Sequence, residues 1–258
     1  MDKMNDLKNI LGSYKKLCVA YSGGTDSDFL LNVAKQVLND NVLAIIGDGR
    51  MVARKDISDA MRLATKAGVK YEVVKADALA VEEFRMNRHD RCYYCKKNIM
   101  GEVLSKARQL GFEIVADGKN ADDAKVYRPG AKAAEELGLV SPLYMAGLSK
   151  EEIRRFGRQM GLETWNKPSN SCLATRFPYD TELSEELLSK VENAEKLISD
   201  CGFVGARVRL HQDIARIELQ KSDFGRFLEN EYLIEKIKNT GFKYVTLDCE
   251  GFRSGSMD

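Results

Sequence analysis

The chain has 258 residues, of which 44% are hydrophobic and 31% are charged, a composition typical of a soluble globular protein and not of a disordered or fibrous one. Its formal net charge of +1 argues against a protein that binds long nucleic acids, because such binding normally needs a cationic surface. Residues 1–11 contain no continuous apolar segment and no run is long enough to span a bilayer, so we expect a cytoplasmic protein with no signal peptide and no membrane partner. In a reducing cytoplasm, the six cysteines are expected to be thiols, metal ligands or catalytic groups.

Strands and helices are predicted to alternate through the first two thirds of the chain. Short apolar runs predict strands at 17–21, 42–46, 69–74 and 112–116, and amphipathic stretches predict helices at 27–37, 56–67 and 93–110. This alternation indicates an α/β domain over residues 1–180, with a parallel sheet covered on both faces.

The remaining residues, 181–258, have a different order of elements. A helix at 184–199 precedes strands at 206–210 and 214–219, and a helix at 224–239 precedes a strand at 244–247. The order α-β-β-α-β predicts a second, smaller α+β domain.

A glycine-rich loop follows the first predicted strand and reads Ser22, Gly23, Gly24, Thr25, Asp26 and Ser27. Glycines let backbone N–H groups approach an oxyanion closely, and the following helix start adds a favourable dipole. Asp26 beside a phosphate site is a candidate magnesium ligand. The string resembles the PP-loop of ATP pyrophosphatases, which implies ATP as the bound nucleotide and Asp117 and Gly118 as a second nucleotide contact. The alternatives are a capped strand–helix turn and, at Asp117, a simple strand-ending turn.

Three cysteines have the spacing of a metal site. Cys92 and Cys95 open the helix predicted at 93–110, where two thiols on adjacent turns can share a metal, and Cys172 in a polar segment is the candidate third ligand. A [4Fe-4S] cluster held by three cysteines leaves one iron free for an external ligand such as hydrosulfide. Zinc binding, disulfide redox chemistry and idle thiols are the alternatives. We expect Cys18 and Cys201 to be core thiols.

Basic residues alternate along the first strand of the second domain, which places them on one face. A phosphate or carboxylate ligand, or a salt-bridged sheet face, would explain this arrangement, and the residues alone slightly favour the second. The residues concerned are Arg207, Arg209 and His211 on one strand, Arg216 and Glu218 on the next, and Arg253 near the C-terminus.

Together these strings resemble one family, the LarE-type sulfur transferases, which are PP-loop enzymes that make the organic part of the nickel-pincer nucleotide cofactor. The resemblance runs over essentially the whole chain. It rests on the loop at 22–27 and on the strings at 93–97, 127–130, 176–179, 207–209, 215–218 and 251–257.

The resemblance implies that ATP adenylates a carboxylate of a small pyridinium mononucleotide and that sulfur then replaces the activated oxygen. It implies catalytic roles for Cys172, Lys96, Asp26 and Arg176. It also implies a substrate site in which Arg207, Arg209 and Arg253 hold the phosphate, Glu218 orients them, and Glu195 and Arg128 take part.

The cysteines divide this family. Members with one cysteine give up its sulfur, whereas members with the additional pair are thought to hold an iron–sulfur cluster supplied by a sulfide donor. With Cys92, Cys95 and Cys172, this chain resembles the second branch, and sacrifice of Cys172 is the alternative. The family also implies a homo-oligomer. One departure is Asp180, at a position where members often have glycine.

Three other functions compete with this interpretation. A tRNA-thiolating PP-loop enzyme would use the same three cysteines but needs a basic RNA-binding face. A synthetase that forms NAD or GMP would leave the cysteines idle. A non-enzymatic ATP sensor with a structural zinc is the third.

Overall fold

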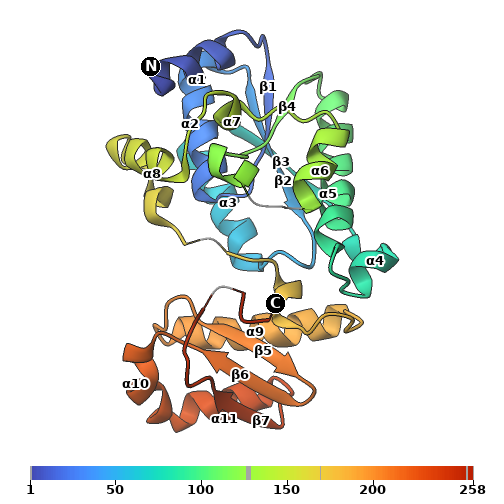
Figure 1. Ribbon diagram of the computed structural model, residues 1–258, viewed down its shortest axis with the longest axis vertical. Helices are drawn as coiled ribbons and strands as arrows, with labels where there is room; N and C mark the ends of the chain where they lie inside the picture. The colour runs from blue at the N-terminus through green and yellow to red at the C-terminus, as the bar shows by residue number, and fades with distance from the viewer. Residues whose placement is uncertain (1, 126–128, 169, 254, 258) are drawn as a thin grey trace. The chain divides into compact units, whose positions relative to one another are not determined.

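The computed structural model describes every residue except 1, 126–128, 169, 254 and 258 (Figure 1). The chain divides into two compact units, one made of residues 1–84 and 90–170 and the other of residues 85–89 and 171–258. Residues 171–180, which the sequence places in the first domain, thus belong to the second unit. The reason is local: the amide of Asn87 donates to the carbonyl oxygen of Pro178 (2.8 Å), and the rings of His89 and Tyr179 stack 3.8 Å apart.

The first unit is built on a four-stranded parallel sheet in the order β3-β2-β1-β4, which confirms the predicted α/β fold. The strands are β1 (Leu17–Ala20), β2 (Val42–Asp48), β3 (Lys70–Lys75) and β4 (Val115–Ala116). The helices are α1 (Lys3–Gly12), α2 (Thr25–Leu38), α3 (Arg54–Lys66), α4 (Glu82–Arg85), α5 (Arg91–Gln109), α6 (Pro129–Glu136), α7 (Pro142–Met145) and α8 (Lys150–Gln159).

Helices cover both faces of this sheet (Figure 1). Leu17 and Val19 of β1 point into a core shared with α1, α2 and α3, whereas Cys18 between them points into a core shared with α5. Successive residues of a strand face opposite sides, so a strand buried on both faces must be apolar throughout. Burial raises the pKa of the Cys18 thiol to about 12, as expected for a core thiol.

The second unit has a three-stranded sheet, β5-β6-β7, in which β6 pairs antiparallel with β5 and parallel with β7. Its strands are β5 (Arg207–His211), β6 (Ile214–Glu218) and β7 (Tyr244–Leu247), and its helices are α9 (Glu185–Asp200), α10 (Phe224–Leu228) and α11 (Glu231–Asn239). Val208 and Ile217 on one face of the sheet are fully buried, as are Leu188 and Val191 of α9.

Three expectations need correction. The helix predicted at 224–239 is two helices, because the Asn230 side chain accepts from the N–H of Leu233 and starts α11. The strand predicted at 112–116 is only two residues long. Cys201 is exposed, since it ends α9 and does not lie on its buried face.

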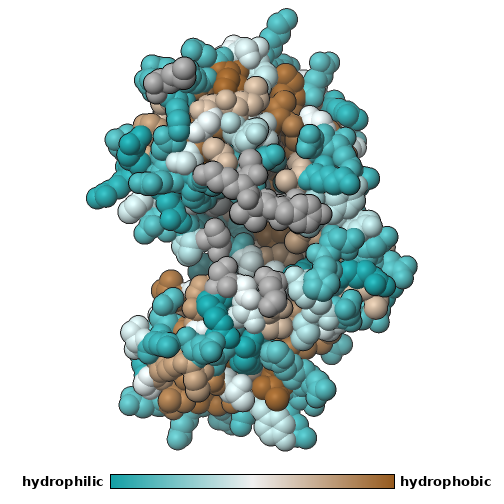
Figure 2. All heavy atoms as spheres, viewed as in Figure 1, coloured by the Kyte–Doolittle hydropathy of each residue, from teal (hydrophilic) through white to brown (hydrophobic). Residues whose placement is uncertain are grey.

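Within the described residues, no helix has the length and apolarity needed to cross a bilayer. Hydrophilic side chains cover most of the face shown in Figure 2, and a few apolar ones remain exposed. Among the large hydrophobic side chains that are exposed in the second unit are Leu228, Tyr232 and Tyr244.

One ion pair ties the first helix of the chain to α8. Ser149 and Glu152 form a capping box at the start of α8, and Lys3 donates to Glu152 at 2.7 Å. The hydrogen bond from Lys3, followed by that from the N–H of Ser149, lowers the pKa of Glu152 from 4.5 to about 2.

We therefore expect Glu152→Gln, which can keep the capping box but loses the charge, to lower the free energy of unfolding at pH 7 by about 0.5–1 kcal/mol. Because the folded-state pKa lies below the unfolded one, the contribution is complete above pH 4.5 and is lost as the pH falls toward 2. Urea unfolding at pH 7 and pH 3 measures it. The variant should differ less from the wild type at pH 3. Glu151→Gln, on the same turn, is the control, and equal losses in both variants would contradict the assignment.

Candidate functional site

The glycine-rich loop joins β1 to α2 and is fixed by its own hydroxyl groups. The N–H of Ser22 donates to Ser27 Oγ at 3.3 Å, the two serine hydroxyls lie 3.1 Å apart, and Ser27 Oγ donates to the carbonyl oxygen of Gly24 at 3.2 Å. Gly24 caps α2 without a side chain, so the first N–H groups of that helix have no side-chain cap. Such a helix start is a site for an oxyanion.

Two glycines allow backbone segments to approach this loop. Gly23 has φ +65°, and a Cβ there would lie 2.9 Å from Cα of Ala60 in α3. A Cβ at Gly118 would lie 3.0 Å from the backbone nitrogen of Ser27. The segment after β4 therefore packs directly on the start of α2, which brings the predicted nucleotide contacts Asp117 and Gly118 to the loop.

A buried carboxylate below the loop holds a distant segment against it. Asp28 is 2% exposed and accepts from the hydroxyls of Tyr21 (2.7 Å) and Thr164 (2.6 Å). The Thr25 hydroxyl in turn donates to the carbonyl oxygen of Thr164 at 2.8 Å, and Lys167 Nζ donates to that of Gly23 at 3.3 Å. Burial, and after it the negative charge of Asp28, raises the pKa of Tyr21, which keeps that phenol a hydrogen-bond donor.

The Asp26 carboxylate has two distinct oxygens. Oδ2 accepts from Lys150 Nζ at 2.6 Å and from the side-chain amide of Asn120 at 3.4 Å. Oδ1 is buried and makes no hydrogen bond within the described residues. A carboxylate oxygen without a donor at a helix start that binds oxyanions fits a Mg²⁺ ligand, since Mg²⁺ is commonly held by one or two carboxylates together with phosphate oxygens.

Sequence reasoning missed Lys150, Lys167, Thr164 and Asn120. They lie about a hundred or more positions beyond the loop in the chain, and only the tertiary fold brings them to it. The sequence does hold a local signal for Lys150, which lies between Ser149 and Glu152 of a capping box that marks a helix start.

Helix α5 carries three of the predicted site residues in its first two turns. Cys92 is exposed, Cys95 is half-buried, and Lys96 Nζ lies 4.0 Å from Asp117 Oδ2, which places this lysine beside the nucleotide segment. A Cβ at Gly130 would lie 3.4 Å from the carbonyl oxygen of Cys92, so α6 packs on this helix start. Arg128, predicted to contact substrate, lies outside the described residues.

In the second unit, the buried side chain of Arg176 connects Glu195 of α9 to the backbone of residues 171 and 172. It is 1% exposed, and its guanidinium forms a bidentate pair with Glu195 at 2.8 and 3.1 Å. Its remaining arm donates to the carbonyl oxygens of Ser171 (3.0 Å) and Cys172 (3.2 Å). Arg176 therefore fixes the backbone that carries Cys172, whose half-buried sulfur accepts from the N–H of Ala174 at 3.3 Å.

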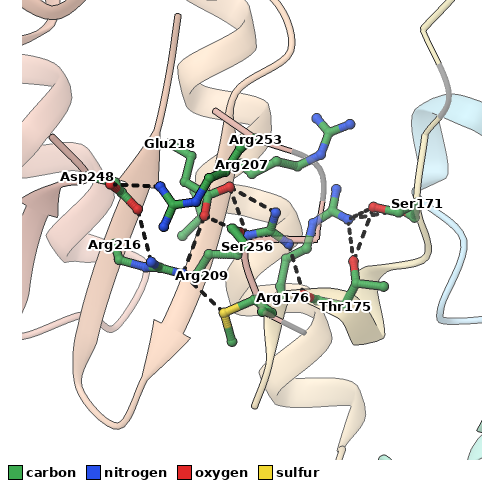
Figure 3. Close-up of polar contacts among 12 residues, drawn as sticks. Ser171, Thr175, Arg176, Arg207, Arg209, Arg216, Glu218, Asp248, Arg253 and Ser256 are labelled. Atoms are coloured by element: carbon green, nitrogen blue, oxygen red, sulfur yellow. Dashed lines mark hydrogen bonds and ion pairs between the residues drawn. The ribbon is translucent and has the colours of Figure 1, made fainter. Parts of the chain in front are cut away.

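The predicted alternation of arginines on the sheet holds. Arg207 lies opposite Glu218, and Arg209 opposite Arg216, across the β5–β6 pair. Glu218 is fully buried, and Arg209 donates to its Oε2 at 2.8 and 3.0 Å and to the carbonyl oxygen of Thr175 at 2.9 Å (Figure 3). Arg207 is 9% exposed and lies 5.5 Å from the centre of the Phe252 ring. Burial, with Arg216 next, lowers the pKa of His211 and favours its neutral form.

The C-terminal segment closes over the same sheet face. Ser256 Oγ donates to Glu218 Oε1 at 2.5 Å, and Asp248 accepts from Arg216 at 2.9 Å and pairs with Arg253 at 3.5 Å. Burial raises the pKa of Asp248, but the N–H of Glu250 and the two arginines outweigh that effect and lower it.

The cluster has more positive than negative charge. Four arginines (176, 209, 216 and 253) pair with the buried carboxylates Glu218 and Asp248, the partly buried Glu195 and the exposed Glu250. Arg207 lies on the same sheet, opposite Glu218. Counted over these described side chains, five positive and four negative charges leave an excess of one, which an anionic group would balance. No group of three or more His, Cys, Asp or Glu side chains is arranged to hold a metal ion, as far as the chain is described.

The oxyanion site at the start of α2, on a parallel sheet whose neighbouring segment packs on the loop, defines the first unit as a PP-loop nucleotide-binding domain. A family model described as NAD synthase matches residues 4–108, which carry the loop.

Relatives of the whole chain define the family more closely. An uncharacterized protein of Synechocystis is 37% identical over 99% of this chain and 97% of its own length. The pyridinium-3,5-bisthiocarboxylic acid mononucleotide synthase of Lactiplantibacillus plantarum is 37% identical over 96% and 91%. An uncharacterized protein of Methanocaldococcus jannaschii is 32% identical over 98% of both chains. The chain belongs to the family of this synthase, an ATP-dependent sulfur transferase family with a PP-loop domain, as its sequence motifs indicate.

We expect Gly23→Ala to lower the free energy of unfolding by about 2 kcal/mol and to weaken ATP binding, because the added Cβ meets the backbone of α3 and φ is positive. Gly24→Ala is the matched control: its φ is −84° and the nearest atom to its Cβ is a serine hydroxyl at 3.4 Å, so the loss should be about 1 kcal/mol or less. Urea unfolding and calorimetric ATP titration measure both. Equal losses would contradict the role of the close approach.

Proposed function

We propose that this protein adenylates a carboxylate of a pyridinium-3,5-biscarboxylic acid mononucleotide with ATP and replaces the activated oxygen with sulfur. The observation that carries the proposal is the 37% identity to the L. plantarum synthase over nearly the whole length of both chains. The cationic sheet face supports it, because a mononucleotide brings a phosphate to balance the excess positive charge. The family resemblance extends the proposal to a cytoplasmic homo-oligomer.

In the first step, a carboxylate oxygen of the substrate attacks the α-phosphorus of ATP. The bond from that phosphorus to the bridging oxygen of the β-phosphate breaks, and pyrophosphate leaves with the electron pair. The backbone amides of residues 22–27 face the charge that develops on the leaving group, and Asp26 Oδ1 would hold Mg²⁺, which neutralises that charge when bound. Lys96, beside Asp117, lies where it can orient the reacting carboxylate.

In the second step, a sulfur nucleophile attacks the carbonyl carbon of the acyl-adenylate, the bond from carbon to the phosphate oxygen breaks, and AMP leaves. Arg176 is fully engaged by Glu195 and by the backbone around Cys172, so we assign it to positioning that segment. Arg207 and Arg253 are the arginines assigned to the substrate phosphate. Arg209, which is bonded to Glu218 and Thr175, orients the strand.

We further propose that Cys92, Cys95 and Cys172 hold a [4Fe-4S] cluster, which would carry sulfide on its fourth iron when bound. Two of the three proposed donors are near each other in the chain, since the Cys92 and Cys95 thiols lie in adjacent turns at the start of α5. The third donor, Cys172, is assigned from the family resemblance alone.

An anaerobic assay with ATP, sulfide and the pyridinium substrate tests this proposal. After reconstitution with iron and sulfide, we expect several turnovers per protein, with the protein mass at Cys172 unchanged. Variants of Cys92, Cys95 or Cys172 should lose the visible absorption of the cluster, whereas Cys249→Ser should keep it. A single turnover with loss of the elements of H₂S from Cys172 would replace the cluster route with sacrifice of that residue.

We expect Asp26→Asn to reduce substrate-dependent pyrophosphate release by roughly a hundredfold or more, because it removes the charged metal ligand but keeps the shape of the side chain. Asp40→Asn, which breaks an exposed ion pair with Lys35 beyond the other end of the same helix, is the control and should leave the rate unchanged. Pyrophosphate release near the wild-type rate in Asp26→Asn would remove Asp26 from the metal site.

A further inference from the structure

Phe252 is an aromatic side chain that remains exposed beside the arginines of the second unit. It is 37% exposed, and the centre of its ring lies 5.5 Å from the guanidinium carbon of Arg207, one of the arginines assigned to the substrate phosphate. We propose that Phe252 determines specificity for the ring of the substrate: its aromatic face stacks on the positively charged pyridinium, while the arginines hold the anionic groups. This inference rests on the pyridinium mononucleotide proposed above as the substrate, and not on the source of the sulfur.

The backbone that carries Phe252 is fixed on both sides of this residue. The N–H of Phe252 donates to the carbonyl oxygen of Leu219, just after β6, at 2.8 Å. A Cβ at Gly251, which has φ +78°, would lie 3.0 Å from the same oxygen, so the two segments pack closely. Further along the chain, Ser256 Oγ donates to the buried Glu218. The ring is therefore presented from a backbone that is already in place, which lowers the entropic cost of stacking a ligand on it.

The charge of the substrate ring needs a partner that the arginines cannot supply. The phosphate and the carboxylates of the substrate are anionic and suit guanidinium groups, but the pyridinium itself carries a positive charge that these groups repel. The face of an aromatic ring carries the negative part of its quadrupole and attracts a cation placed over it. Phe252 therefore offers an uncharged surface that favours the ring cation within a cluster of positive charges.

The position of Phe252 also suits the shape of a mononucleotide. A single ribose separates the phosphate from the ring, so a residue that recognises the ring must lie close to the residues that hold the phosphate. Phe252 is adjacent to both arginines assigned to that phosphate: Arg207 lies against its ring, and Arg253 is the next residue in the chain. The pairing of Arg253 with Asp248 at 3.5 Å keeps this part of the segment on the sheet.

The contact with Phe252 would act on binding and not on the chemical steps. Adenylation and sulfur transfer both take place at a carboxylate outside the ring, and the ring nitrogen keeps its positive charge throughout. Stacking therefore stabilises the bound substrate and the transition state to the same extent. A variant without the aromatic face should raise KM and leave kcat nearly unchanged, whereas loss of a group that acts in the reaction would lower kcat.

Calorimetric titration of Phe252→Leu with three ligands tests the proposal without ATP or any sulfur donor. The ligands are nicotinamide mononucleotide, whose ring is a pyridinium, its reduced 1,4-dihydro form, whose ring is uncharged, and ribose 5-phosphate, which has no ring of this kind. Leucine keeps the apolar bulk but removes the aromatic face, so we expect the affinity for the pyridinium form to fall about fivefold to thirtyfold. The affinity for the reduced form should fall less than about threefold, and that for ribose 5-phosphate should not change.

Tyr232→Leu is the matched control. It removes another exposed aromatic ring with a cation beside it, since Lys236 Nζ lies 4.5 Å from its centre, and it should change none of the three affinities. Phe252→Tyr keeps an aromatic face and should retain the affinity for the pyridinium form within about twofold.

Two results for Phe252→Leu would overturn the proposal. Equal losses for all three ligands would mean that Phe252 only supports the phosphate site, and an unchanged affinity for the pyridinium form would mean that the ring is not recognised by this residue. If the wild type binds neither ribose 5-phosphate nor the mononucleotide, the proposed substrate fails together with this inference. Failure of this inference alone, with ligand binding by the wild type intact, is therefore distinguishable from failure of the proposed function.

Discussion

The buried carboxylate of Asp28 fixes the geometry of the nucleotide loop. A carboxyl group that is 2% exposed needs full hydrogen bonding, and it finds donors in Tyr21 before the loop, Asn32 in α2 and Thr164 far along the chain. Removing any one of these donors would leave part of a charge without compensation. The loop, the helix that follows it and the segment at 163–167 are therefore held as one body, on which the glycines can present their backbone to a phosphate.

Much of this fold follows from local sequence. The apolar runs at 42–46 and 69–74 predict β2 and β3 to within two residues. The first five residues of β2 are buried on both faces, which leaves little choice of side chain, whereas β3 is a mostly exposed edge strand. Other elements depend on single capping groups. Asn230 separates α10 from α11, although the apolar pattern continues through both, and periodicity alone does not detect that break. The assignment of 85–89 to the second unit could not be predicted, since it depends on contacts with residues about 90 positions later.

Some parts of the candidate site can also be predicted from local sequence, and others cannot. A glycine-rich string after a strand identifies the oxyanion site, because the backbone N–H groups that bind an oxyanion belong to consecutive residues and can be recognised in the sequence. The cations around it come from elsewhere: Lys150 is 124 positions from Asp26, and nothing in the sequence between them specifies the pair. On the second sheet, alternation correctly put four charged residues on one face. The salt-bridged face, one of the two alternatives that the sequence offered, is present, because Arg209 is committed to Glu218. The phosphate site on the same face stays a proposal.

The loop threonine links the two chemical steps that we assign to this protein. Thr25 donates to the carbonyl oxygens of Thr164 and Lys167, and the chain reaches Cys172 five positions after Lys167. A phosphate bound at the start of α2, as we propose, would contact the same helix turn that holds the segment leading to Cys172. Beyond that segment, the backbone of Cys172 is held by Arg176, whose own position is set by Glu195. These contacts fix the backbone around Cys172, the residue that we propose to carry or deliver sulfur, and its half-buried Sγ accepts from the N–H of Ala174.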